Sequence, residues 1–198
     1  MGKTIIISNR LPIQLQIHNG GITAVPSVGG LATGMKSVHS GGDSLWIGWS
    51  GLTDEEILDS WEIYKKVNQK FADAIIEKAN EDDTIWIHDY QLMLVPQMVK
   101  EKLPDISIGF FLHIPFPSFE IFRTLPWRKE ILEGFLGSDL IGFHTYDYER
   151  HFLSSVRRLL GLEVSFNDIY LEDRIIKVDS FPMGIDYKKF NDAAKDHL

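Results

Sequence analysis

Short runs rich in β-branched and aromatic residues alternate with helical patterns along most of this chain, and this alternation constrains the fold more than any other feature. The expected strands are residues 3–9, 45–49, 84–88, 106–113, 139–143 and 174–181. The expected helices are residues 27–39, 54–80, 91–102, 119–135 and 147–160. Apolar strands that alternate with helices are typical of parallel strands joined by helical crossovers. The pattern therefore predicts an α/β fold with a doubly wound, mainly parallel sheet.

A β-hairpin is expected near the N-terminus. Residues 13–25 alternate polar and apolar side chains around Asn19-Gly20-Gly21, and an Asn-Gly pair favours the tight turn of a hairpin. Further along, Trp61, Tyr64, Val67, Phe71 and Ile75 recur at helical spacing within residues 54–80. With 198 residues and neither an internal repeat nor a linker, the chain is expected to form a single domain, residues 1–198.

Composition excludes several classes of function. The chain has 20 Lys and Arg against 28 Asp and Glu, a net charge of −8, which argues against a general nucleic-acid or anionic-membrane binder. It contains no cysteine, so disulfides, thiolate catalysis and cysteine-based zinc sites are excluded. The apolar runs are far shorter than the roughly 20 residues of a membrane helix, and the N-terminus shows no signal-peptide pattern. We therefore expect a cytoplasmic protein with no membrane partner.

Polar and aromatic residues of chemical interest stand where four of the expected strands end. Arg10 follows the first strand, Trp49 lies in Gly48-Trp49-Ser50-Gly51, Asp89 follows His88, and His113 precedes two closely spaced prolines. In open α/β sheets, ligands bind outside the carboxyl ends of the strands. These four residues are therefore expected to converge on one crevice.

Each of these residues also has a purely structural interpretation. Arg10 could form a surface ion pair, Trp49 could fill the core, and Asp89 could cap the helix that begins near Gln91. His113 could be a core histidine with its polar groups satisfied, and His88 is expected to be a buried structural residue. The sequence favours solvated or packing roles for His144, His151, Arg157 and Arg158.

Gly29 and Gly30 precede an expected helix. Two glycines in this place would let backbone N–H groups and the positive end of the helix dipole approach an anion. The run lacks the Gly-x-Gly opening of a dinucleotide-binding fingerprint, and a plain turn explains the pair equally well.

Taken together, these motifs resemble the trehalose-6-phosphate synthases, retaining glycosyltransferases of the two-domain GT-B architecture. The matching segments run in family order over nearly the whole chain: Ser8-Asn9-Arg10, Gly29-Gly30-Leu31-Ala32, Trp46-Ile47-Gly48-Trp49-Ser50-Gly51, Trp61-Glu62-x-Tyr64-Lys65-x-Val67-Asn68, Ile85-Trp86-Ile87-His88-Asp89-Tyr90, Gly109-Phe110-Phe111-Leu112-His113-Ile114-Pro115-Phe116-Pro117, Asp139-Leu140-Ile141-Gly142-Phe143-His144-Thr145 and Pro182-Met183-Gly184-Ile185-Asp186. The resemblance implies a Rossmann-like domain that binds the acceptor sugar.

The resemblance also implies a reaction and a role for each site residue. Glucose would pass from UDP-glucose to glucose 6-phosphate with retention, giving trehalose 6-phosphate and UDP, with no metal or other cofactor. The residues implied to bind glucose 6-phosphate are Arg10 at the phosphate, Trp49 as an aromatic wall and Asp89 at the sugar hydroxyls. The residues implied to bind UDP-glucose are Gly29 and Gly30 under the diphosphate and His113 at the glucose. Asp89 and His113 are the residues implied to act in catalysis.

The chain departs from the family pattern in two ways. It resembles only the N-terminal half, without the C-terminal donor domain and its Arg/Lys pair for the diphosphate. A long segment of the family, with a Tyr and a Trp that line the acceptor pocket, is replaced here by residues 51–60. We therefore expect little activity from this chain alone. Three alternatives remain open: a related pseudo-glycosyltransferase, a glucosyltransferase with another phosphosugar acceptor, or a non-catalytic sugar-phosphate sensor, each of undetermined oligomeric state.

Overall fold

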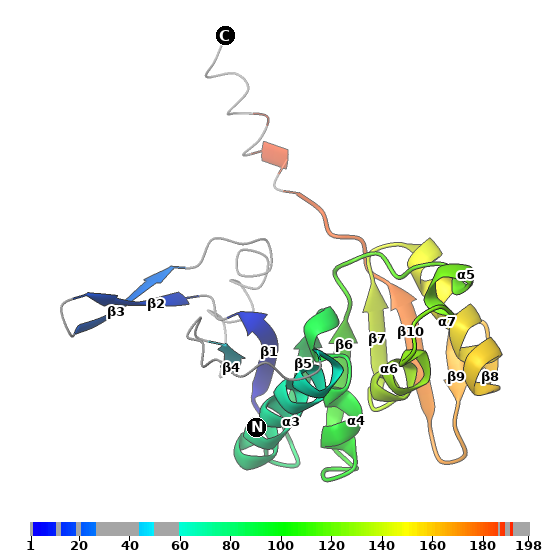
Figure 1. Ribbon diagram of the computed structural model, residues 1–198, viewed down its shortest axis with the longest axis horizontal. Helices are drawn as coiled ribbons and strands as arrows, with labels where there is room; N and C mark the ends of the chain where they lie inside the picture. Colours follow the sequence, from blue (N-terminus) through cyan, green and yellow to red (C-terminus); the bar gives the residue numbers. More distant parts are fainter. Residues whose placement is uncertain are drawn as a thin grey trace.

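The fold is built on an eight-stranded sheet with the order β4-β1-β5-β6-β7-β10-β9-β8 (Figure 1). The computed structural model describes residues 2–10, 13–18, 21–26, 44–49, 60–185, 187–188 and 191. In sheet order, the strands are β4 (Ser44–Trp49), β1 (Thr4–Arg10), β5 (Thr84–His88), β6 (Ser107–Phe111), β7 (Leu140–Phe143), β10 (Ile175–Ser180), β9 (Asp168–Tyr170) and β8 (Glu163–Ser165). Every pair from β4 to β10 is parallel, and only the two pairs that involve β9 are antiparallel. The mainly parallel sheet predicted from the sequence is confirmed.

The predicted hairpin is also present. Strands β2 (Ile13–His18) and β3 (Gly21–Pro26) pair antiparallel, with His18 opposite Gly21 across the turn. The hairpin forms a separate two-stranded sheet that projects beyond the β1 and β4 side of the main sheet (Figure 1).

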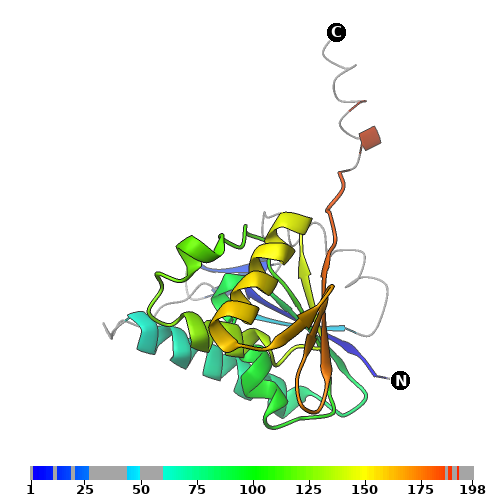
Figure 2. The same ribbon diagram turned by 90° about the vertical axis from the view of Figure 1, so that its right-hand side faces the viewer.

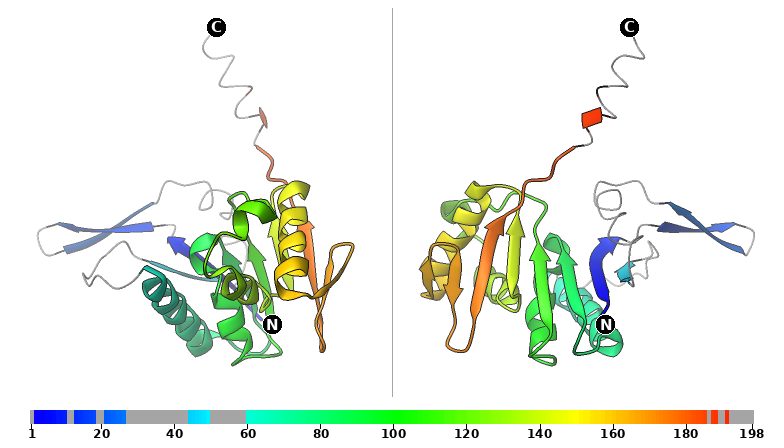
Figure 3. Two further views of the ribbon diagram at one scale, coloured as in Figure 1. Left: turned by 45° about the vertical axis from the view of Figure 1, so that its right-hand side comes forward. Right: turned by 180° about the vertical axis from the view of Figure 1, so that it is seen from behind.

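The described α-helices cover one face of the main sheet. They are α3 (Ser60–Lys78), α4 (Val95–Lys100), α5 (Phe119–Phe122), α6 (Arg128–Phe135) and α7 (Tyr146–Leu160). Figure 2 shows them on the same side of the strands, and the view from behind in Figure 3 shows the opposite face. The helix predicted at 27–39 lies outside the described residues.

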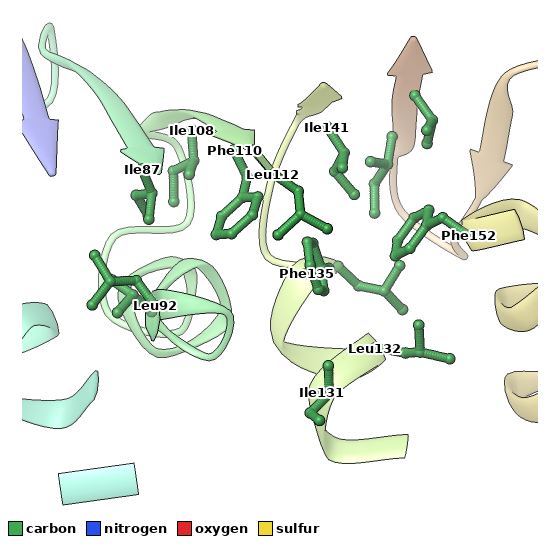
Figure 4. Close-up of a cluster of buried hydrophobic side chains, with 14 of the residues drawn as sticks. Ile87, Leu92, Ile108, Phe110, Leu112, Ile131, Leu132, Phe135, Ile141 and Phe152 are labelled. Atoms are coloured by element: carbon green, nitrogen blue, oxygen red, sulfur yellow. The ribbon is translucent and has the colours of Figure 1, made fainter. Parts of the chain in front are cut away.

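The core lies between this face of the sheet and the helices. Every second strand residue points toward the helices, and the pairs that do so are Ile5 and Ile7, Ile85 and Ile87, Ile108 and Phe110, Ile141 and Phe143, and Ile176 and Val178, all 1% exposed or less. They belong to one cluster with Leu92, Val99, Phe135 and Phe152 (Figure 4). Burial of this apolar area is the main favourable contribution to folding, and it holds the strand ends in register.

Two predicted helices are interrupted. The helix expected at 91–102 is a short 3-10 helix, η1 (Tyr90–Leu92), followed by α4, and Pro96 lies in the first turn of α4. The helix expected at 119–135 is divided into α5 and α6, with Pro126 between them. Proline has no N–H and clashes with the preceding turn, so it is accepted only where a helix begins. The prediction of continuous helices at these two places was wrong.

Helix α3 differs from its predicted pattern in one respect. Val67 is 36% exposed, whereas Asn68 is completely buried. The face of α3 that contacts the protein therefore includes a polar side chain that the apolar spacing did not indicate.

Candidate functional site

The four strand ends singled out in the sequence lie at one edge of the sheet. Arg10 and Trp49 are the last residues of β1 and β4 and are partners in the register of these strands. Asp89 directly follows β5, and His113 comes two residues after β6. Because β4, β1, β5 and β6 are parallel neighbours, the backbone at all four positions lies at their shared carboxyl edge, as predicted. Gly29 and Gly30 lie outside the described residues.

Asp89 has an unusual backbone conformation. Its φ of 75° and ψ of 167° fall in a region that is essentially reserved for glycine and costs other residues roughly 1–3 kcal/mol. Its N–H donates to the Phe111 carbonyl of β6 at 2.9 Å. Strain of this kind persists only where surrounding contacts enforce it, and it is concentrated at functional sites.

The Asp89 side chain also caps the short helix that follows it. Asp89 is the N-cap residue of η1, and its Oδ1 accepts a hydrogen bond from Tyr90 N at 3.0 Å. The capping interpretation is therefore confirmed, although for a three-residue 3-10 helix. None of the described residues forms a hydrogen bond to Oδ2.

His88 and His113 form a hydrogen-bonded pair beside Asp89. His88 Nδ1 lies 3.0 Å from His113 Nε2. His88 is 1% exposed, as its expected structural role requires, and burial, with His113 as a further cause, lowers its pKa to about 3. Burial also lowers the pKa of His113, although the neighbouring Asp89 carboxylate acts in the opposite direction and His144 adds to the lowering. Both imidazoles are therefore neutral near pH 7.

His144 completes an aromatic cluster at this edge. Its ring centroid lies 5.3 Å from that of His113 and 5.0 Å from that of Phe111. The sequence favoured a solvated or packing role for His144, and packing is what the structure shows. The contacts of His88 and His144 with His113 were missed, although all three histidines follow or end neighbouring strands.

Two residues of α3, Tyr64 and Asn68, were also missed as contributors to this edge. Their side chains form hydrogen bonds with the segment that follows Asp89. The sequence did contain one signal. Asn68 is a polar residue on the apolar face of the predicted helix, within a motif that was used above only for its family resemblance.

Neither a metal centre nor a membrane span is found in the part of the chain that the structure describes. It contains no group of three or more His, Asp or Glu side chains arranged to hold a metal ion. No helix within it is long and apolar enough to cross a bilayer. A hollow of about 380 Å³ lies between α5, α7 and the turn that joins β8 to β9, and its lining includes neither Asp89 nor His113.

Comparison with known proteins gives consistent matches. The model of Glycosyltransferase family 20 matches residues 58–197. A curated protein from Candida albicans, an alpha,alpha-trehalose-phosphate synthase (UDP-forming), is 38% identical over 251 residues, which cover 98% of this chain and 52% of the relative. This alignment is longer than the 198-residue chain, so the relative has residues without a counterpart here. A segment missing at 51–60 would account for this difference.

Solved structures agree with the sequence comparison. An alpha,alpha-trehalose-phosphate synthase (UDP-forming) from Burkholderia xenovorans in complex with glucose-6-phosphate is 26% identical, with a TM-score of 0.79, over 98% of this chain and 52% of that one. A structure described as trehalose-6-phosphate from E. coli bound with UDP-2-fluoro glucose is 26% identical, with a TM-score of 0.79, over 98% and 51%. The chain spans between a third and about half of the length of the curated relatives that it matches.

Proposed function

The chain belongs to glycosyltransferase family 20, and from this premise we propose that it is the acceptor-binding part of an enzyme that transfers glucose from UDP-glucose to glucose 6-phosphate. The products are trehalose 6-phosphate and UDP. The observation that carries the proposal is the strained Asp89 at the carboxyl edge, whose carboxylate lies close enough to His113 to oppose the lowering of that histidine's pKa by burial.

Each site residue has a proposed role. Arg10 binds the 6-phosphate through charge-assisted hydrogen bonds, Trp49 packs against the acceptor sugar, and Asp89 accepts hydrogen bonds from its hydroxyls. Gly29 and Gly30 lie under the donor diphosphate, and His113 binds the donor glucose near the reacting carbon. The shared carboxyl edge of β1, β4, β5 and β6 supports this grouping.

The proposed chemistry is a substitution on one face of the donor sugar. The anomeric hydroxyl oxygen of glucose 6-phosphate bonds to C1 of the donor glucose as the bond from C1 to the UDP oxygen breaks. The proton of that hydroxyl passes to the departing diphosphate. The protein contributes by positioning the reactants and stabilising charge. The scheme needs no resident metal, and we propose the cytoplasm as the place of the reaction.

Turnover is expected to need more than this chain, because it spans about half of its relatives and resembles only their acceptor side. We expect negligible transfer when the chain is assayed alone with UDP-glucose and glucose 6-phosphate. Turnover comparable to that of an intact synthase would contradict this division of roles.

Binding of the acceptor tests the proposal on the chain itself. Titration with glucose 6-phosphate, followed by amide NMR, is expected to shift residues at the carboxyl edge, with glucose binding more weakly. Asp89→Asn and Arg10→Ala should each weaken binding about ten- to a hundredfold, the equivalent of a charged hydrogen bond worth roughly 1.5–3 kcal/mol. Asp105→Asn, an exposed position before β6, is the control and should bind as the wild type does. Unchanged affinity in Asp89→Asn would remove Asp89 from the acceptor site.

A further inference from the structure

The backbone that follows Asp89 is hydrogen-bonded to the side chain of Tyr64 on α3. The Tyr64 hydroxyl donates to the Tyr90 carbonyl at 2.7 Å and accepts from Met93 N at 3.0 Å. Burial is the main cause that raises the pKa of Tyr64 far above its ordinary value. The hydroxyl therefore keeps its proton and remains a donor to Tyr90 at any pH the protein meets.

Asn68, one helical turn further along α3, binds the same segment. Its Nδ2 donates to the Gln91 carbonyl at 2.9 Å, and its Oδ1 accepts from Leu94 N at 3.0 Å. Nδ2 also donates to the Tyr64 carbonyl at 2.8 Å, which ties the side chain to its own helix. Asn68 is completely buried, so its side chain is shielded from solvent in the folded protein.

Tyr64 and Asn68, here called the α3 clamp, thus satisfy four backbone groups between Tyr90 and Leu94. This segment contains only a single 3-10 turn before α4 begins, so its backbone lacks the regular bonds of a longer helix. Buried backbone groups without partners are strongly disfavoured. The α3 clamp therefore favours one path for the chain after Asp89.

The tyrosine ring of the clamp is itself held in place. Trp61 stacks on Tyr64 with ring centroids 5.3 Å apart and on Trp127 at 4.8 Å. The second contact connects the clamp to the residue that precedes α6. The clamp is therefore a packed assembly rather than a pair of mobile side chains.

We propose that Tyr64 and Asn68 are positioning residues that hold the Asp89 carboxylate in its ligand-binding orientation. The proposal rests on the proposed function of Asp89. On one side, Asp89 is fixed to β6 through the bond from its N–H to the Phe111 carbonyl. On the other side, the α3 clamp holds backbone groups of Tyr90, Gln91, Met93 and Leu94. With both sides fixed, the backbone at Asp89 cannot relax to a common conformation without breaking these hydrogen bonds.

The test compares clamp variants with a control at the other end of the same strand. Tyr64→Phe removes the hydroxyl with its two bonds, and Asn68→Ala removes the amide. Asp83→Ala is the matched control, because Asp83 is 4% exposed and accepts hydrogen bonds from Lys3 N and Asn80 N, both at 2.9 Å, near the amino end of β5. All three variants lose side-chain hydrogen bonds to backbone amides, but only the first two contact the segment that directly follows Asp89.

Two measurements on the 198-residue chain decide the matter. Amide hydrogen exchange should become faster at Met93 in Tyr64→Phe and at Leu94 in Asn68→Ala, but not at either site in Asp83→Ala. Affinity for glucose 6-phosphate should fall about two- to tenfold in each clamp variant, the equivalent of a hydrogen bond lost from the support of the site. Asp83→Ala should lower the melting temperature and leave this affinity unchanged.

Three results would overturn the proposal. They are unchanged exchange at Met93 and Leu94 in the clamp variants, unchanged affinity despite faster exchange, and an equal loss of affinity in Asp83→Ala. Failure of the proposed function is recognised separately, because the wild-type chain would then not bind glucose 6-phosphate. In that case the exchange measurement, which needs no ligand, still decides whether the clamp holds the segment.

Discussion

Replacement of His88 by phenylalanine is expected to change which nitrogen of His113 carries the proton. His88 Nε2 is buried and has no hydrogen-bond partner among the described residues. An unpaired N–H in such a place is rarer and more costly than an unpaired lone pair. The proton of neutral His88 therefore belongs on Nδ1, which donates to His113 Nε2 across the 3.0 Å contact. His113 must then carry its own proton on Nδ1.

The size of the effect follows from this one hydrogen bond. A net hydrogen bond is worth about 0.5–1.5 kcal/mol, which corresponds to roughly a two- to tenfold change in an equilibrium. In His88→Phe, the ratio of the Nδ1–H to the Nε2–H form of His113 should fall by about this factor. Fold stability should change little, because the substitution also removes the unpartnered Nε2 from the interior.

Nitrogen chemical shifts from long-range ¹H–¹⁵N NMR at pH 7 report the tautomer directly. His88→Asn is the matched control, because its side-chain amide can place an N–H near the position of the lost Nδ1–H. It should keep His113 in the wild-type tautomer. The reasoning is refuted if wild-type His113 carries its proton on Nε2, if it is charged at pH 7, or if His88→Phe leaves the tautomer unchanged.

Two further outcomes are expected for stability. Gly134→Ala should lower the free energy of unfolding by about 1–3 kcal/mol, because a Cβ there would lie 2.4 Å from the Met93 carbonyl oxygen. The control is Gly184→Ala, where an added Cβ meets nothing within 4 Å. Equal melting temperatures for the two variants would contradict this prediction. Burial, and then the neighbouring Asp179, raise the pKa of Glu149, while Ser180 acts in the opposite direction. The folded protein therefore holds this proton more tightly than the unfolded chain does. It loses stability as the pH rises above the ordinary pKa of 4.5. Relative to wild type, Glu149→Gln should therefore be more stable at pH 7 than at pH 4. Denaturant titrations measure the difference in the free energy of unfolding between the variant and the wild type. The same difference at both pH values would exclude a raised pKa for Glu149.

The sequence predicted the sheet and its carboxyl edge because both depend on local patterns. Runs such as Thr4-Ile5-Ile6-Ile7 are typical of buried parallel strands, and the residue after each strand is located as soon as the strand is. Strands β8 and β9 were not predicted, since three residues carry too little pattern to identify a strand. The two interrupted helices are a different case, because Pro96 and Pro126 were visible and their effect on helix continuity was underestimated.

The contacts around the candidate site could not be read from the sequence, because they join elements that are distant along the chain. The His88–His113 bond depends on the register that places His88 opposite Phe111. The bonds from Asn68 depend on how α3 packs against the segment after β5. A helical pattern indicates which face is buried, but it does not indicate which backbone groups that face will meet.

Asn68 and Asp89 illustrate why such residues conflict with local preference. An apolar residue in place of Asn68 would suit the buried face of α3, but it would leave the Gln91 carbonyl and Leu94 N without partners, and unsatisfied buried groups cost about 1–3 kcal/mol each. A glycine in place of Asp89 would adopt φ 75° without steric cost, but it would carry no carboxylate. The chain thus has an aspartate where the backbone favours glycine and an amide where the helix face favours an apolar side chain. Because the amide binds the segment that directly follows the strained aspartate, the proposed role of Asp89 would explain the two exceptions together, as a way to hold one carboxylate at the carboxyl edge.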